Sequence, residues 1–173
     1  HPWINRDLMI GHGSLGLEIV EDCPDVDTVF VPVGGGGLMG GVGTAIKALK
    51  PVVRVVAVEP EGCPSLYESL RQGRPASVEC RTICDGVAVP YMTDEVFPVL
   101  REIVDDAVLV SDDDVRATIR DLALRDRIVV EPAGALAVAA AKAMPSRERG
   151  RAVALVTGGS IDTDTLIEIL QNK

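Results

Sequence analysis

A run of four consecutive glycines, Gly34–Gly37, constrains the fold of this chain more than any other feature. The valine-rich residues 27–33 before it predict a buried strand, and residues 37–49 after it predict a helix. Glycine lets the backbone wrap closely around a ligand, and a helix N-terminus offers free N–H groups and a partial positive charge. The segment therefore predicts a binding site for an anionic group such as a phosphate.

Two known phosphate-binding loops can be compared with these glycines. A P-loop requires Gly-Lys-Ser or Gly-Lys-Thr, and no lysine follows the run. A dinucleotide-binding fingerprint, G-x-G-x-x-G, is spelled by Gly35, Gly37 and Gly40. Glu59 ends the next predicted strand, where an acid in such proteins meets a ribose hydroxyl. On these residues alone, NAD binding by a Rossmann domain stays open as an alternative.

The composition favours a parallel α/β domain. Of the 173 residues 47% are hydrophobic but only 3% are aromatic, so the core must consist of Val, Ala, Leu and Ile. Such residues suit parallel strands that are buried on both faces. Strands and helices alternate along the whole chain, so we expect one domain over residues 1–173, a parallel sheet with helices on both faces. The predicted strands cover 27–33, 53–58, 107–110 and 152–156, and the predicted helices 13–22, 37–49, 64–71, 94–104, 132–144, 163–170 and a segment from Ser111.

Charge and cysteine content limit the partners and the compartment. The formal net charge of −9 argues against general binding of nucleic acid. The sequence contains no run of eighteen apolar residues, so no membrane span is expected. The four cysteines form no C-x-x-C pair, so we expect four reduced thiols in a cytoplasmic protein: Cys23, Cys63, Cys80 and Cys84.

Five motifs extend the analysis beyond the glycine run. VPVGGGGL, AVEP, DGVAV, EPAGALA and TGGSID occur in this order between His1 and Leu170. Together they resemble the threonine/serine dehydratase family of fold-type II pyridoxal-phosphate enzymes, to which serine racemases are close. The resemblance implies the C-terminal portion of that fold, with pyridoxal 5'-phosphate as the cofactor.

The resemblance implies a set of cofactor-binding residues. Gly34, Gly35, Gly36 and Gly37 match the loop that holds the cofactor phosphate, and Thr157 matches the position that hydrogen-bonds the pyridine nitrogen. Asp85 and Gly86 match a stretch beside the ring, and Glu131 matches an acid near its pyridine side. A hydroxyl at Thr157 cannot hold a pyridinium proton as a carboxylate does. The ring would then be a weaker electron sink, which suits β-elimination better than transamination.

Other family features are absent from the sequence. The Schiff-base lysine of the S-x-K-x-R motif and the S-x-G-N-H segment would lie upstream of His1. No lysine present occurs in that context: these are Lys47, Lys50, Lys142 and Lys173. We therefore expect no catalytic residue in this chain and no activity from it alone. Some relatives bind a cation through a Glu and an Asp six residues later. In this chain Glu59 is present, but the residue six positions later is Ser65 and not Asp, so no metal site is expected.

The sequence thus predicts part of a pyridoxal-phosphate-dependent ammonia-lyase that converts a β-hydroxy amino acid into a 2-oxo acid and ammonia. A non-catalytic fragment that binds a phosphate ligand or a partner is the other alternative besides the NAD domain. Threonine and serine both stay open as substrates, as do dehydration and racemisation. We further expect a homo-oligomer, an exposed apolar face where the missing region would pack, solvated side chains at Lys47 and Lys50, and His12 in a loop.

Overall fold

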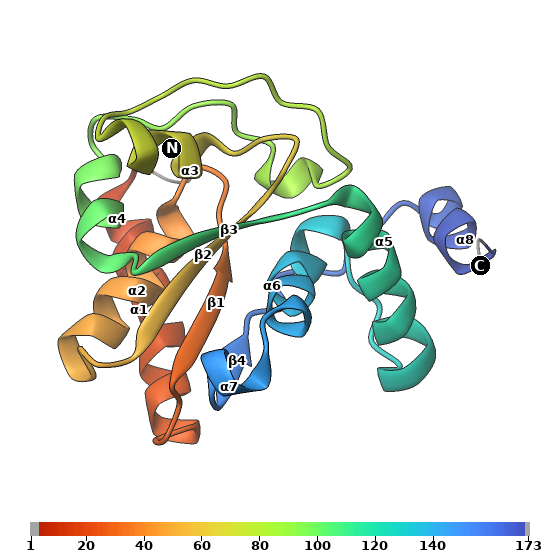
Figure 1. The fold of residues 1–173 in the computed structure, drawn as a ribbon, viewed down its shortest axis with the longest axis horizontal. Helices are drawn as coiled ribbons and strands as arrows, with labels where there is room; N and C mark the ends of the chain where they lie inside the picture. The colour runs from red at the N-terminus through yellow and green to blue at the C-terminus, as the bar shows by residue number, and fades with distance from the viewer. Residues whose placement is uncertain (1–3, 172–173) are drawn as a thin grey trace.

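Four parallel strands form the centre of the computed structural model, which describes residues 4–171 (Figure 1). The spatial order of the strands is β3-β2-β1-β4. Valine-rich β1 is buried along its whole length, which explains its continuous apolar sequence. Thr28 in β1 lies opposite Arg54 in β2 and Ala152 in β4, so one register aligns all three strands. The strands span Thr28–Pro32 (β1), Arg54–Pro60 (β2), Asp106–Val110 (β3) and Ala152–Ala154 (β4).

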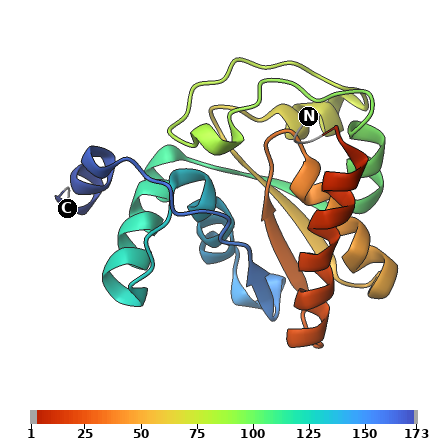
Figure 2. The same ribbon diagram turned by 180° about the vertical axis from the view of Figure 1, so that it is seen from behind.

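Helices cover both faces of this sheet, as the sequence predicted (Figures 1 and 2). On one face an apolar cluster that includes Met39, Ile46 and Leu100 joins the sheet to α1 (Arg6–Asp22), α2 (Gly37–Leu49), α3 (Ser65–Gln72) and α4 (Phe97–Ile103). On the other face a second cluster that includes Phe30, Ile119 and Leu136 joins it to α5 (Asp112–Asp121), α6 (Pro132–Ala143) and α8 (Thr163–Gln171). The remaining elements are short: η1 (Asp85–Val87), η2 (Leu122–Asp126) and α7 (Ser146–Arg149).

The largest boundary error concerns α1, which begins at Arg6 instead of residue 13. The side chain of Asn5 caps this helix by accepting hydrogen bonds from the N–H groups of Asp7 (2.8 Å) and Leu8 (3.3 Å). Glycines within the first turns hid the helical pattern, since glycine has a low helix propensity. His12 therefore lies in a helix, and its expected place in a loop was wrong.

The expectation of four reduced thiols was also wrong. Cys63 and Cys80 form a disulfide between residues 17 positions apart, whereas Cys23 and Cys84 are free. Spacing alone gives no sign of this pair, because the fold brings the two loops together. Burial raises the pKa of the Cys84 thiol to about 12, so this residue stays protonated and unreactive near neutral pH.

Apolar side chains are exposed near the β4 edge of the sheet. β4 itself is only half-buried, and the exposed fractions of Ile128, Val129 and Val156 are 45%, 52% and 43%. Exposed apolar side chains are thus present in this part of the surface, while what covers them stays a prediction. Among the described residues, no helix is long and apolar enough to cross a membrane.

Candidate functional site

The loops that follow β1 and β4 diverge at the carboxyl edge of the sheet. From β1 the chain runs through α2 on one face to β2, whereas β4 is reached from α6 on the opposite face. Ligands of open α/β sheets bind where the direction of the connections reverses in this way. In this chain the reversal lies between the glycine run after β1 and Thr157 after β4.

The glycine run leads directly into α2. Gly36 is the N-cap and has a φ of 90°, in the left-handed region that favours glycine. In the described part of the chain, no side chain caps this helix end. The first-turn N–H groups therefore point outward without a side-chain partner, at the positive end of a 13-residue helix. This geometry fits a phosphate group.

A cavity of about 380 Å³ opens beside these N–H groups. It brings together residues that are far apart in the sequence: the glycine run, the stretch after Cys84, the start of α6 and the loop after β4. Seven of the eight predicted cofactor-binding residues line it, and Asp85 is the exception. Its lining comprises His12, Pro32, Gly34, Gly35, Gly36, Gly37, Leu38, Met39, Gly86, Val87, Val89, Glu131, Ala133 and Thr157.

Glu131 holds the loop that carries Thr157. Its backbone N–H donates to the carbonyl of Gly158 (3.0 Å), and its side-chain Oε2 accepts from the N–H of Ser160 (3.1 Å). A Cβ at Gly158 would lie 2.7 Å from the Glu131 carboxyl carbon, so a larger residue there would displace this carboxylate. The contacts fix the backbone just after Thr157, an exposed residue whose side chain lies at the cavity.

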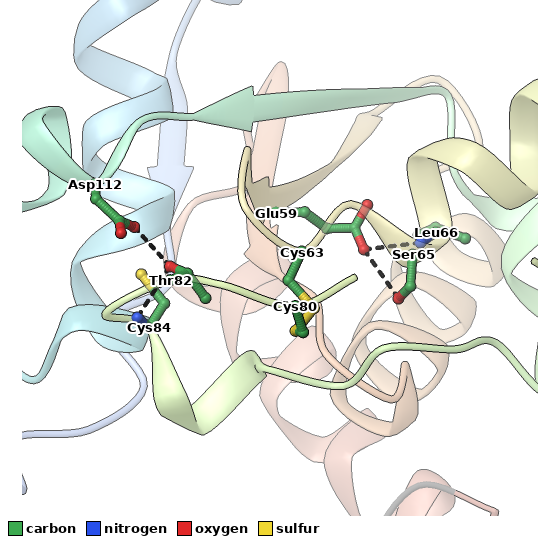
Figure 3. Close-up of a disulfide and its surroundings, with 8 residues drawn as sticks. All are labelled: Glu59, Cys63, Ser65, Leu66, Cys80, Thr82, Cys84 and Asp112. Atoms are coloured by element: carbon green, nitrogen blue, oxygen red, sulfur yellow. Dashed lines mark hydrogen bonds between the residues drawn. A yellow bond between two sulfur atoms is a disulfide. The ribbon is translucent and has the colours of Figure 1, made fainter. Parts of the chain in front are cut away.

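Asp85 does not line the cavity; instead its exposed side chain accepts from the N–H of Gly86 (2.8 Å). The residues just before it are held by Asp112, in the first turn of α5. Asp112 accepts from the hydroxyl of Thr82 (2.6 Å) and the N–H of Ile83 (3.1 Å), as Figure 3 shows in part. Asp112 therefore supports the wall to which Gly86 belongs, a role that only the folded structure reveals.

Glu59 does not point to a ribose site. Its carboxylate is buried and accepts from the N–H groups of Leu66 (2.8 Å) and Tyr67 (2.7 Å), so it caps α3. Figure 3 shows the hydrogen bond to Leu66. Burial raises the pKa of Glu59 to about 7 despite these hydrogen bonds. The NAD alternative needs this carboxylate free for a ligand, and the capping geometry argues against it.

The described lysines all lie outside the cavity lining. Lys47 pairs with Asp105 (2.6 Å), and its side chain is only 19% exposed, so the expected solvation of Lys47 was wrong. Lys50 donates to the carbonyl of Pro24, and Lys142 pairs with Asp121. Lys173 lies outside the described residues. Over residues 4–171, no group of three or more His, Cys, Asp and Glu side chains is arranged to hold a metal ion.

A family model described as "Pyridoxal-phosphate dependent enzyme" matches residues 1–158. The chain belongs to this family. The cofactor that defines the family is pyridoxal 5'-phosphate, and the uncapped start of α2 together with the glycine-lined cavity fits its phosphate group. The resemblance inferred from the five motifs is therefore confirmed.

Curated relatives include threonine ammonia-lyases and serine racemases. The chain is 39% identical to the L-threonine ammonia-lyase of Thermotoga maritima over 171 residues, which cover 98% of the chain and 43% of that relative. It is 37% identical to the catabolic L-threonine dehydratase TdcB of Escherichia coli K12, covering 97% of the chain and 52% of the relative. The chain thus spans about half the length of the curated relatives it matches.

Solved structures share the fold of the chain. Maize serine racemase superposes with a TM-score of 0.90 at 33% identity, covering 97% of this chain and 53% of that one. The processed form of threonine deaminase isoform 2 from Solanum lycopersicum gives a TM-score of 0.92 at 34% identity, covering 98% and 50%. The predicted fold class, a parallel α/β sheet that forms part of the fold-type II architecture, is therefore confirmed.

Proposed function

We propose that this chain forms the phosphate- and pyridine-binding portion of a pyridoxal-phosphate-dependent ammonia-lyase of the threonine/serine dehydratase type. The observation that carries the proposal is the single cavity that joins the uncapped glycine run to Thr157 and Glu131. The threonine ammonia-lyase and dehydratase among the similar proteins support this type of reaction. Serine racemases match as well, so racemisation is the second candidate.

Each predicted cofactor-binding residue has a part in the proposal. The N–H groups at the start of α2 hold the cofactor phosphate, and the Thr157 hydroxyl hydrogen-bonds the pyridine nitrogen without protonating it. Glu131 keeps Thr157 in place through Gly158 and Ser160, and Gly86 lies beside the ring, with Asp85 at its outer edge. When bound, pyridoxal phosphate supplies the electron sink for chemistry at the substrate α-carbon.

The base that removes the α-proton is expected from the part of the relatives that this chain does not cover. The described lysines are all away from the cavity, so we propose that residues 1–173 act as one cofactor-binding domain and that the chain alone is inactive. We also propose that the complete enzyme takes an amino acid as its substrate and is a cytoplasmic homo-oligomer.

A charge placed at the phosphate site tests the proposal. In Gly37→Asp a carboxylate would occupy the first turn of α2, where it suits the helix dipole and repels phosphate. We expect the affinity for pyridoxal phosphate, measured by fluorescence titration, to fall at least about tenfold, equivalent to ~1.4 kcal/mol. Thr44→Asp adds the same charge to an exposed position of the same helix and should leave the affinity unchanged.

Two controls sharpen this experiment. Circular dichroism must show that both variants keep the fold, and inorganic phosphate must compete with pyridoxal phosphate in the unmodified chain. Equal loss of affinity in both variants, or no competition by phosphate, would count against the proposed site.

A further inference from the structure

The cavity wall that contains Gly86, Val87 and Val89 belongs to a long irregular segment between Gly73 and Tyr91. Its only helical turn is η1, and its only β-type pairing is one bridge between Ser77 and Tyr91. A segment of this kind has few backbone hydrogen bonds of its own, so its position depends on separate anchoring contacts.

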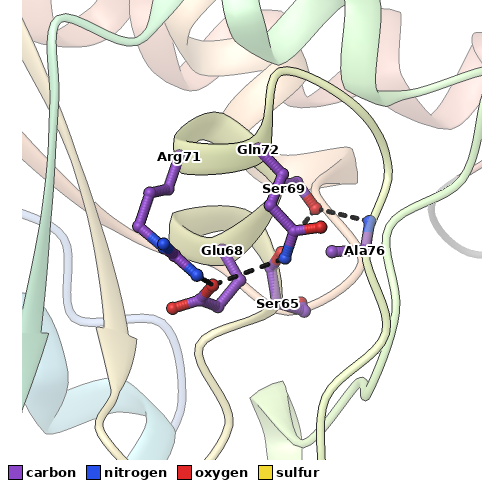
Figure 4. Close-up of polar contacts among 6 residues, drawn as sticks. All are labelled: Ser65, Glu68, Ser69, Arg71, Gln72 and Ala76. Carbon is purple, nitrogen blue, oxygen red and sulfur yellow. Dashed lines mark hydrogen bonds and ion pairs between the residues drawn. The ribbon is translucent and has the colours of Figure 1, made fainter.

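Polar contacts anchor this segment before and after Cys80. On the N-terminal side, the N–H of Ala76 donates to Ser69 Oγ in α3 (3.0 Å), as Figure 4 shows. On the C-terminal side, Asp112 holds Thr82 and Ile83. Between these anchors, the Cys63–Cys80 disulfide is the covalent link, supported by one hydrogen bond from the N–H of Arg81 to the carbonyl of Gly62 (2.8 Å).

The two cysteines differ in their surroundings (Figure 3). Cys63 is buried in the loop between β2 and α3, which Glu59 fixes by capping α3. Cys80 is only partly buried and lies six residues before Gly86. The disulfide therefore joins a fixed loop to the segment that forms the cavity wall, and its more exposed cysteine is on the wall side.

We propose that the Cys63–Cys80 disulfide is a redox-sensitive tether that keeps the wall of the cofactor cavity in place. The inference rests on the proposed function, since it takes the cavity as the cofactor site. The cytoplasm, which we propose as the location of this protein, is a reducing compartment. A disulfide there is commonly transient and regulatory, which suits a redox-sensitive tether. Reduction would leave only non-covalent contacts between the two loops near Cys80: the Arg81–Gly62 hydrogen bond and the close approach of Gly62 to Arg81 and Thr82.

The redox step needs an external dithiol. Its thiolate attacks the Cys80 sulfur, the S–S bond breaks, and Cys63 leaves as a thiolate that takes up a proton. The second thiol of the reductant then releases Cys80, so that the cysteine pair gains two electrons and two protons while the dithiol becomes a disulfide. Cys84 takes no part, because its thiol is fully buried and remains protonated.

The test compares the oxidised chain with the same chain in dithiothreitol. Reduction should raise the number of titratable thiols from two to four in denaturant. Amide hydrogen exchange across residues 79–89 should then become about tenfold faster, while exchange in β1 and β2 stays the same. The dissociation constant of pyridoxal phosphate should rise about five- to tenfold, the effect of one modest contact.

Two variants separate the tether from other effects of the reductant. Cys63→Ala combined with Cys80→Ser should behave like the reduced chain and no longer respond to dithiothreitol. Cys23→Ser changes a free cysteine and should keep the full response. Four titratable thiols under oxidising conditions, or unchanged exchange over 79–89 after reduction, would overturn the tether. Faster exchange without pyridoxal phosphate binding in either redox state would overturn the proposed function and leave the tether standing.

Discussion

At the scale of single residues, the buried carboxyl of Glu59 makes the stability of the fold depend on pH. In the folded chain the pKa of this carboxyl is about 7, whereas its ordinary value is 4.5, because burial disfavours the charged form. A raised pKa means that the folded state binds more protons between these values. The contribution of Glu59 to stability is therefore fully present below about pH 4.5 and is lost as the pH rises to about 7.

The variant Glu59→Gln tests this pH dependence. An amide cannot titrate, so the unfolding free energy of the unmodified chain minus that of the variant should fall by about 3 kcal/mol from pH 4.5 to pH 7.5. Urea unfolding at several pH values measures the difference. A difference that stays constant over this range would show that Glu59 titrates normally.

Thr157 is the residue that separates ring binding from phosphate binding. Thr157→Val keeps the shape of the side chain but removes the hydroxyl that we propose for the pyridine nitrogen. Because one hydrogen bond contributes about 1 kcal/mol, the affinity for pyridoxal phosphate should fall about fivefold. The affinity for inorganic phosphate should not change, and calorimetric titration of both ligands checks this. A parallel loss for both ligands would contradict the assignment of Thr157.

At the scale of elements, the first turn of α5 supports the cavity wall. Asp112→Ala removes the acceptor for Thr82 and Ile83, so we expect a loss of about 1–3 kcal/mol in unfolding free energy, measured by chemical denaturation. The exposed Asp113 in the same helical turn provides the control, since Asp113→Ala removes an equal charge. If both variants lose the same stability, the helix dipole and not the wall contact explains the effect.

The elements also show how far the sequence could predict the structure. Strand β1 and helix α2 follow from valine-rich and apolar local patterns, so their positions were predicted within one residue. The start of α1 depends on the cap at Asn5, and the π-helical turn at Leu122–Asp126 has no pattern of its own. Boundaries of this kind are set by side-chain contacts and tertiary packing.

Some residues of the candidate site could likewise be predicted from the sequence, and others could not. The glycine run can be recognised from the sequence alone, because four adjacent glycines before a helix are typical of a loop that binds an anionic group. Thr157, Gly86 and Glu131 came only from the family resemblance, since no local pattern marks them. The support from Asp112 and the disulfide partner of Cys63 depend on contacts between distant segments, which one sequence does not reveal.

At the scale of the whole molecule, the apolar surface near β4 is the main unexplained feature. Exposed Ile128, Val129 and Val156 would be stabilised by covering, so we expect the chain to self-associate at micromolar concentration. Val129→Lys should shift the assembly toward monomer, as measured by sedimentation equilibrium. Val52→Lys, at an exposed site in the loop between α2 and β2, is the control. A monomer in all three proteins would refute self-association through this surface.

The central claim is that the cavity binds a pyridoxal cofactor through its phosphate. The most direct measurement compares the dissociation constants of pyridoxal phosphate and pyridoxal, which differ only in that group, for the unmodified chain. Our account predicts that pyridoxal phosphate binds at least about tenfold more tightly, since the start of α2 supplies N–H groups and a positive dipole for the phosphate. Equal affinity for the two compounds would contradict it.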